Sequence, residues 1–343
     1  MMRLPSFRYV APRTIADAAK WLGQAPGEAM VLAGGTDLLP NMKRRQQTPG
    51  VLVALRNVDG LRARHVNGDL SIGAGVTLAE MVRDERLRET CSGLWQAAAQ
   101  VATPHLRNMA TLGGNLCLDT RCTYYDQTHE WRKAIDFCMK KDGEICWVAT
   151  SSPKCLAVSS TDTAPMLQAL DAAVRLVSAA GERTIKVADL YQNDGMHYLT
   201  RRPDEILTDV IVADQTGRRS AYWKLRRRGS FDFPVASAAA SVRMEGDTVT
   251  DVSIVLGAVA SRPLASEKAR TVLVGQRLTD DVIAAAADAA YEIGKPMDNT
   301  DFALVWRKRM IRTLVTCALR EVRGDDVREL RRKLARQTLQ MAS

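Results

Sequence analysis

Four of the seven cysteines fall in one stretch of the chain, residues 120–159: Cys122, Cys138, Cys146 and Cys155. Four thiolates are what a tetrahedral zinc site or a cubane iron–sulfur cluster requires. No Cys-x-x-Cys pair of the kind found in zinc ribbons and bacterial ferredoxins occurs among them, so the prediction depends on their grouping. The stretch is polar, with few aliphatic residues to build a core, and a metal would be needed to order it. The grouping therefore predicts a metal or iron–sulfur centre.

Other candidate ligands and catalytic motifs have simpler explanations. Cys117 and His129 lie nearby in the sequence, but a cysteine in a glycine turn is expected to pack, and a histidine on a polar loop to be solvated. Cys91 and Cys317 fall within predicted helices and are expected in the core. No His-Glu-x-x-His, Gly-x-Ser-x-Gly or Walker sequence occurs, so neither hydrolysis nor phosphoryl transfer is predicted.

Two glycine turns predict a bound nucleotide cofactor. Gly34-Gly-Thr-Asp37 follows a short apolar run, and Thr111-Leu-Gly-Gly-Asn115 lies farther along the chain. In such turns, backbone N–H groups can converge on an anion such as a pyrophosphate. One turn alone would be interpreted as an ordinary strand end, whereas two that meet across a cleft favour a cofactor site. A Rossmann site is rejected, because the sequence Ile72-Gly-Ala-Gly-Val-Thr-Leu78 has leucine where the fingerprint needs its third glycine.

The elements that must position these residues follow from helix caps and hydrophobic periodicity. Residues 1–57 predict a βαβ unit, in which a helix starts at Thr14 with Asp17 at the capping-box position. Residues 58–216 predict a second subdomain, which contains the 120–159 insert. Its expected elements are a strand at 70–74, a helix capped by Thr77, a helix at 93–101, a hairpin at 173–187 and a strand at 205–212.

The chain beyond a short polar segment at residues 215–220 shows a different order of elements. Three probable strands come first and helical segments follow, starting near Ser266, Asp280 and Phe302. This order predicts an α+β C-terminal domain over residues 217–325, with a three-stranded antiparallel sheet and helices. Residues 326–343 predict a basic helix or tail.

Composition and charge limit the classes of function. The 343 residues are 46% hydrophobic, without an apolar run long enough for a membrane span or a secretory signal, so a cytoplasmic protein with no membrane association is expected. The net charge of +9 is spread over several basic groups, and aromatic residues make up only 5%. Solvated faces or an acidic partner subunit are therefore favoured, with no nucleic acid. A basic nucleic-acid-binding protein with a structural metal site stays as an alternative.

The motifs together resemble the FAD-binding subunits of molybdenum hydroxylases, the xanthine dehydrogenase family. Matching stretches span nearly the whole chain in family order: Leu32-Ala-Gly-Gly-Thr-Asp-Leu38, Ile72-Gly-Ala-Gly-Val-Thr-Leu78, Ala110-Thr-Leu-Gly-Gly-Asn115, Asp162-Thr-Ala-Pro-Met-Leu-Gln-Ala-Leu170, and Lys224 with Ser230-Phe-Asp-Phe-Pro-Val-Ala-Ser237. The resemblance implies a PCMH-type (vanillyl-alcohol oxidase-like) FAD-binding fold of two α/β subdomains plus the C-terminal α+β domain.

The 120–159 insert sets this chain apart from most of that family, whose members go almost directly from the Gly-Gly-Asn turn to the Asp162 segment. The insert, including Thr120-Arg-Cys-Thr-Tyr124, resembles that of the β subunits of 4-hydroxybenzoyl-CoA reductases, which carries a [4Fe-4S] cluster. The resemblance implies that the four insert cysteines are the cluster ligands.

The resemblance also implies which residues contact FAD. They are Val31, Leu32, Ala33, Gly34, Gly35, Thr36, Asp37, Leu38, Thr103, Thr111, Gly113, Gly114, Asn115, Asp162 and Lys224. The first eight are expected beside the pyrophosphate. Asp162 is expected to accept a hydrogen bond from ribose, and Lys224 to bring a positive charge near flavin or phosphate. Either of these two charges could instead belong to the surface.

The function implied by the resemblance is electron transfer. Electrons from ferredoxin would pass through the cluster and FAD to a small subunit with two [2Fe-2S] clusters and then to a large molybdenum subunit, in a dimer of heterotrimers. There 4-hydroxybenzoyl-CoA would lose its phenolic hydroxyl, so this chain holds no catalytic acid–base residue. A related dehydrogenase or hydroxylase, acting oxidatively on another substrate, is the alternative.

Overall fold

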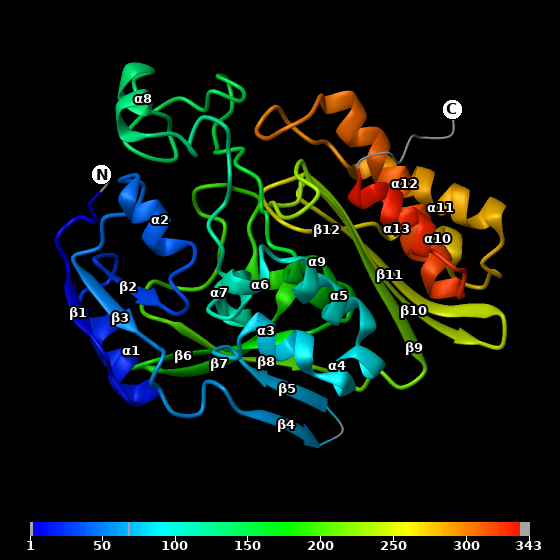
Figure 1. Cartoon of the computed structure of the whole chain (residues 1–343), viewed down its shortest axis with the longest axis horizontal. Helices are drawn as coiled ribbons and strands as arrows, with labels where there is room; N and C mark the ends of the chain where they lie inside the picture. Colours follow the sequence, from blue (N-terminus) through cyan, green and yellow to red (C-terminus); the bar gives the residue numbers. More distant parts are fainter. Residues whose placement is uncertain (1–2, 68, 337–343) are drawn as a thin grey trace.

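The computed structural model describes residues 3–67 and 69–336, which form an α+β protein with three sheets (Figure 1). This architecture confirms the predicted fold class. No helix in the described part of the chain is both long and apolar enough to cross a membrane.

The first sheet carries the first glycine turn. Its strands run parallel in the order β1-β3-β2. Helix α1 begins after Thr14, whose hydroxyl accepts a hydrogen bond from the Asp17 N–H at 3.1 Å, as the capping position predicted. The elements are β1 (Arg8–Val10), α1 (Ile15–Gln24), β2 (Ala29–Leu32), α2 (Leu38–Lys43) and β3 (Val51–Ala54). The turn therefore lies directly between β2 and α2.

The second sheet is antiparallel, in the order β4-β5-β8-β6-β7, and short helices pack on it. The elements are β4 (Arg64–Asn67), β5 (Asp69–Gly73), α3 (Leu78–Arg83), α4 (Glu85–Thr90), α5 (Ser92–Gln100), α6 (Pro104–Arg107), α7 (Leu112–Leu116), α9 (Thr163–Ala169), β6 (Ala173–Ser178), β7 (Gly181–Lys186), η1 (Val187–Leu190) and β8 (Ile206–Val212). Thr77 and Glu80 form the reciprocal capping box that opens α3. The second glycine turn forms α7 itself.

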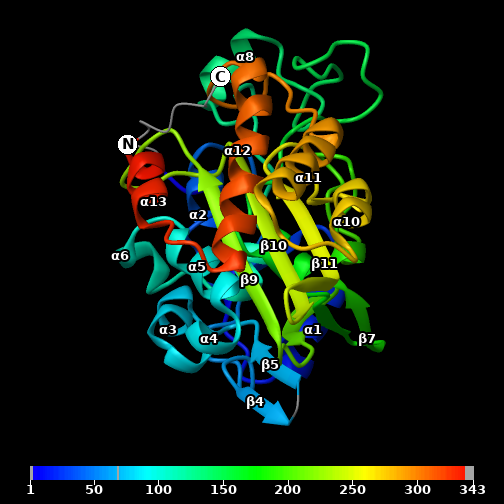
Figure 2. The ribbon, with the colours of Figure 1, turned by 90° about the vertical axis from the view of Figure 1, so that its right-hand side faces the viewer.

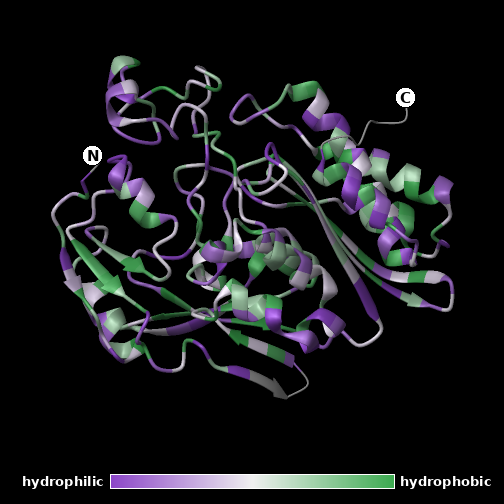
Figure 3. Cartoon of the chain, in the orientation of Figure 1, coloured by the Kyte–Doolittle hydropathy of each residue, from purple (hydrophilic) through white to green (hydrophobic). Residues whose placement is uncertain are grey.

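The insert projects from this subdomain, and its helix α8 (His129–Ala134) lies above α2 in Figure 1. Arg121 and Val158 exchange backbone hydrogen bonds of 2.8 and 2.7 Å, which close the base of the insert. Farther out, the Arg132 guanidinium donates to the Arg44 carbonyl at 2.9 Å, which ties α8 to the end of α2. In Figure 3, β2 and β3 are largely hydrophobic, whereas α8 and its neighbouring loops mix hydrophilic and hydrophobic residues.

The C-terminal sheet has the order β12-β11-β10-β9, with α10 to α13 on one face (Figure 2). The elements are β9 (Arg218–Leu225), β10 (Ala236–Glu245), β11 (Thr248–Gly257), β12 (Leu264–Ala265), α10 (Glu267–Leu273), α11 (Asp280–Ile293), α12 (Leu304–Arg323) and α13 (Arg328–Ala335). The sequence predicted three strands; the fourth, β12, has two residues and is too short to show an alternating pattern. Helices α5 and α9 contact the same sheet, so the C-terminal domain is packed against the second subdomain.

Candidate cofactor sites

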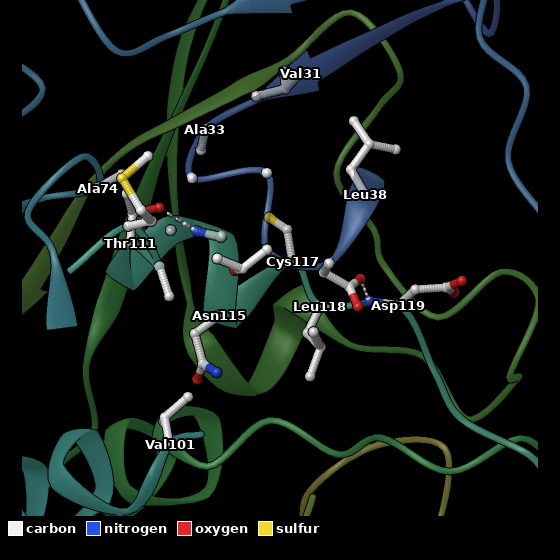
Figure 4. A pocket seen from close by; sticks show the side chains of 18 of the residues that line it. Val31, Ala33, Leu38, Ala74, Val101, Thr111, Asn115, Cys117, Leu118 and Asp119 are labelled. Atoms are coloured by element: carbon white, nitrogen blue, oxygen red, sulfur yellow. Dashed lines mark hydrogen bonds between the residues drawn. The ribbon is translucent and has the colours of Figure 1, made fainter. Parts of the chain in front are cut away.

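A cleft of about 840 Å³ opens between the two N-terminal subdomains and the loop at residues 228–233. A volume of this size is typical of a pocket for a large organic ligand. In Figure 4, Ala33 and Leu38 from the first glycine turn lie above Thr111 and Asn115 from the second. The cleft is therefore built around the two turns that the sequence singled out.

Most residues expected to contact a cofactor line this cleft. They are Val31, Ala33, Gly34, Gly35, Thr36, Asp37, Leu38, Thr111, Gly113, Gly114, Asn115 and Asp162. Three others do not line it. Leu32 ends strand β2, and the Thr103 hydroxyl caps α6 by accepting from the Leu106 N–H at 3.3 Å. The Lys224 ammonium pairs instead with Asp162, which does line the cleft.

The two glycine turns touch each other. A Cβ added at Gly34 would overlap the backbone carbonyl of Met109, which lies just before the second turn. A Cβ at Gly113 would come within 2.7 Å of the Ala74 side chain. Gly35 has φ of 71°, in the left-handed region that favours glycine. These three glycines allow the backbones that line the cleft to approach closely.

Asn115 joins the second turn to the segment at residues 161–163. Its side-chain oxygen accepts hydrogen bonds from the Thr161 hydroxyl at 2.8 Å, the Thr163 hydroxyl at 2.7 Å and the Thr163 N–H at 3.2 Å. All three residues are buried. Since buried donors without acceptors are costly, the asparagine fixes the position of the neighbouring Asp162.

Asp162 and Lys224 form a buried ion pair at the wall of the cleft. The Lys224 ammonium lies 3.0 Å from one Asp162 oxygen, and the Tyr222 hydroxyl donates to the other at 2.8 Å. The ammonium also donates to the Gln100 carbonyl at 2.9 Å. Burial raises the pKa of the Asp162 carboxyl, and burial lowers the pKa of the Lys224 ammonium, while each charge opposes the shift of the other. The pair links α9 of the second subdomain to β9 of the C-terminal domain.

A second set of charges lies at the edge of the cleft that faces the insert. Arg121 is buried and pairs with Asp37 of the first glycine turn and with Asp126 of the insert, the latter at 3.2 Å. Its guanidinium also lies 4.9 Å from the ring centroid of Phe233, on the loop of the C-terminal domain. Arg121 thus contacts the first glycine turn, the insert and the loop of the C-terminal domain beside the cleft.

The four insert cysteines line one small pocket, which is separate from the cleft. Cys122 and Cys138 are each 7% exposed, and Cys146 and Cys155 each 4%. All four are free thiols. Burial raises the pKa of the Cys122 thiol to about 12 and that of Cys155 to about 11. The fold thus brings to one pocket the four thiols that the sequence groups in one stretch.

The arrangement of the thiols differs from that of a single-metal site. Within residues 3–67 and 69–336, no three His, Cys, Asp or Glu side chains are placed to hold one metal ion. The rest of the pocket wall is mainly aromatic and apolar, with Tyr124, Tyr125, Met139, Trp147 and Val148 among its members. The four thiols therefore line a largely apolar pocket.

Sequence reasoning missed several residues that line the cleft. They include Cys117, Asp119, Arg121, Tyr198, Arg201 and Phe233. Cys117 was expected only to pack within its turn, but it borders the cleft as well. For the others, the only sequence signal was proximity to a motif, as for Arg121 beside Cys122 and for Phe233 within the Ser230 to Ser237 stretch.

Comparisons with known proteins agree with this architecture. The model of the FAD binding domain in molybdopterin dehydrogenase matches residues 5–213, and that of the CO dehydrogenase flavoprotein C-terminal domain matches residues 220–322. The carbon monoxide dehydrogenase medium chain of Afipia carboxidovorans is 29% identical over 321 residues, covering 93% of this chain and 97% of the relative. The aldehyde oxidoreductase FAD-binding subunit PaoB of Escherichia coli K12 is 32% identical over 327 residues, covering 91% and 98%.

A solved structure agrees as well. Carbon monoxide dehydrogenase from Hydrogenophaga pseudoflava, in a form lacking the Mo-pyranopterin moiety, superposes with a TM-score of 0.78 at 26% identity, covering 94% of this chain and 98% of that one. The two family models together match nearly the whole chain, and the first alone matches more than half of it. The chain therefore belongs to the FAD-binding subunits of the molybdenum hydroxylases, the family of xanthine dehydrogenase and of the CO dehydrogenase medium chain.

Proposed function

We propose that this chain is the FAD and [4Fe-4S] subunit of a molybdenum enzyme that reductively dehydroxylates 4-hydroxybenzoyl-CoA. The observation that carries the proposal is the pocket formed by Cys122, Cys138, Cys146 and Cys155, next to the cleft of an FAD-binding fold. An FAD subunit without a further redox centre has no need of four buried, unpaired thiols in an inserted segment. The thiols are grouped in the sequence and line one pocket in the fold, and these two observations support one site.

The cleft fits FAD in size and in backbone geometry. We assign the two glycine turns, residues 31–38 and 111–115, to the cofactor, because their close contact leaves backbone rather than side chains along the wall. When bound there, FAD supplies the exchange of electrons in ones or twos. In this assignment Asp162 borders the cofactor, while Lys224 acts through Asp162 rather than by direct contact. Thr103 and Leu32 support the backbone beside it.

We assign the insert pocket to an iron–sulfur cluster rather than to a zinc ion. Zinc needs all four sulfurs at about 2.3 Å from one atom. In a cubane each thiolate binds a different iron, so the sulfurs stand around a larger centre. Because all four thiols line one pocket, we assign one thiol to each iron of such a cluster. When bound there, the cluster supplies one-electron transfer, and the apolar wall excludes water from it.

The partners and the reaction in this proposal lie outside the chain. The relatives are named as medium chains or FAD-binding subunits, and we infer a large molybdenum subunit and a small subunit with two [2Fe-2S] clusters here as well. Reduced ferredoxin is the electron donor. Removal of the phenolic hydroxyl from 4-hydroxybenzoyl-CoA consumes two electrons and two protons, forms a C–H bond and releases water, leaving benzoyl-CoA.

An oxidative dehydrogenase or hydroxylase is the second candidate. It is favoured by the names of the relatives, which include carbon monoxide dehydrogenase and aldehyde oxidoreductase. In that case electrons would leave through this chain instead of entering by it. The family match does not support the nucleic-acid alternative, which requires a protein without flavin absorption bands.

The test is an assay of the purified complex prepared without air. We expect flavin absorption bands, four irons and four sulfides in this subunit beyond those of the small subunit, and release of benzoyl-CoA when 4-hydroxybenzoyl-CoA is supplied with reduced ferredoxin. A complex that contains all its cofactors but leaves the acyl-CoA unchanged would exclude the proposed substrate. A flavin-containing subunit without iron or sulfide would exclude the cluster while leaving the family assignment intact.

A further inference from the structure

The wall between the cleft and the thiol pocket is one layer of side chains thick. The segment at residues 117–122 runs along it: Cys117, Asp119 and Arg121 line the cleft, and Cys122 lines the pocket. Across the wall, Lys140 and Tyr125 also line the pocket. A side chain on one side of the wall therefore touches a side chain on the other.

Lys140 makes that contact. Its ammonium lies 2.8 Å from an oxygen of Asp119, and both side chains are only 5% exposed. It also donates to the Thr120 hydroxyl and to the Gly195 carbonyl, each at 2.7 Å. Asp119 and Gly195 lie in the FAD-binding subdomain outside the insert, and Thr120 is the insert's first residue, whereas Lys140 lies within the insert, two residues after Cys138. This lysine thus fixes the insert against the cleft wall.

Aromatic rings and a backbone contact complete the surroundings of Lys140. The ammonium lies 4.8 Å from the ring centroid of Tyr125 and 5.4 Å from that of Tyr198, a residue of the cleft. The Tyr125 hydroxyl donates to the second oxygen of Asp119 at 3.0 Å. Gly195, which accepts from Lys140, donates its own N–H to the Cys155 carbonyl at 2.8 Å. The charge is thus enclosed, close to the thiols and shielded from solvent.

We propose that Lys140 is a positioning residue that holds the thiol pocket at a fixed place against the cleft and raises the reduction potential of the centre bound there. The inference rests on the proposed cluster. A buried cation stabilises added negative charge, and the low effective dielectric keeps the effect from being screened as it would be at the surface. Asp119, on the cleft side of the pair, has the opposite charge and should have the opposite effect.

The test is a redox titration of the intact complex, followed by the electron paramagnetic resonance signal of the reduced cluster. In Lys140→Met, we expect the ratio of reduced to oxidised cluster at a fixed applied potential to fall about tenfold. For a one-electron couple, this corresponds to a midpoint potential that is lower by about 59 mV. Asp119→Asn should shift the midpoint upward, and Lys140→Arg should stay near the wild type. Lys141→Met is the matched control, because it removes the same charge from the next residue, whose side chain is 32% exposed.

The opposite signs separate an electrostatic role from a structural one. Lys140→Met and Asp119→Asn shifting in the same direction, or Lys140→Met matching Lys141→Met, would overturn the inference. If Lys140→Met loses its iron, Asp119→Asn decides: an upward shift supports the inference, and an unchanged midpoint refutes it. A wild-type subunit without iron and sulfide would instead refute the proposed cluster, so the two failures are distinguishable.

Discussion

Loss of the Lys224 ammonium should strongly destabilise the protein. The Lys224 and Asp162 side chains are 0% and 4% exposed, and the methionine in Lys224→Met leaves a buried carboxylate without its cation. Removal of one partner from a buried pair costs about 3 to 5 kcal/mol of unfolding free energy. We expect a loss of this size in urea unfolding of the FAD-loaded protein, followed by fluorescence and circular dichroism at pH 7.

A second ion pair in the same chain provides the control. Lys186 and Asp171 lie 2.7 Å apart, but their side chains are 52% and 79% exposed. Lys186→Met should therefore cost only about 0 to 1 kcal/mol, the usual range for a surface pair. Equal losses in the two variants would refute the reasoning, because the larger loss expected for Lys224→Met depends on the burial of its pair.

The pH dependence gives an independent check of the cause. In Lys224→Met, burial raises the folded-state pKa of Asp162 without the opposing ammonium, so the folded protein holds the proton more tightly than the unfolded chain. Stability is then lost as pH rises above the ordinary Asp value of 3.8. The deficit relative to the wild type should grow from acid to neutral pH. The double variant with Asp162→Asn should recover part of the loss, and a deficit that does not change with pH would exclude the uncompensated carboxylate as its cause.

Three further changes test the two sites separately. Cys138→Ser should remove iron and sulfide while flavin absorption persists; loss of both cofactors would show that the insert supports the cleft. Gly34→Ala should abolish FAD retention on gel filtration, since its Cβ would overlap the Met109 carbonyl, whereas Gly23→Ala, with open space around it, should retain FAD. Asn115→Ala should lower the unfolding free energy by about 1 to 3 kcal/mol for each threonine donor left unsatisfied. The same variant should bind FAD more weakly in a fluorescence titration. Unchanged binding would argue against the role of Asn115 in placing Asp162.

The sequence predicted those features that depend on local chemistry. The caps at Thr14 and Thr77 are formed as expected, and the two glycine turns line the cleft. Caps and turns are determined within a few residues, so a single chain carries their signal. Strands β1 and β12 were not located, because two or three residues show no periodicity. The assigned domain boundaries, including the insert at 120–159, stay a proposal, although the family models also meet near residue 216.

The contacts between distant segments could not be predicted in the same way. Lys140 was one polar residue in a polar insert, and nothing in its neighbourhood pointed to Asp119 or Tyr198. Lys224 was expected to contact the cofactor directly, but the fold places it behind Asp162, where its charge is already paired. Pairings of this kind are decided by how the domains pack, and no local pattern specifies them.

The insert depends for its order on polar contacts with the rest of the chain. Its apolar cluster contains four buried residues, Cys122, Tyr125, Cys155 and Ala157, and two of these are the thiols themselves. Such a cluster buries little apolar area, so hydrophobic packing contributes little to its stability. At the base, the Arg121–Val158 hydrogen bonds and the Lys140–Asp119 pair fix the insert to the cleft wall. Cys138 and Cys146 lie outside that cluster, and the proposed centre, held by all four thiols, would join the segment at residues 138–146 to the base.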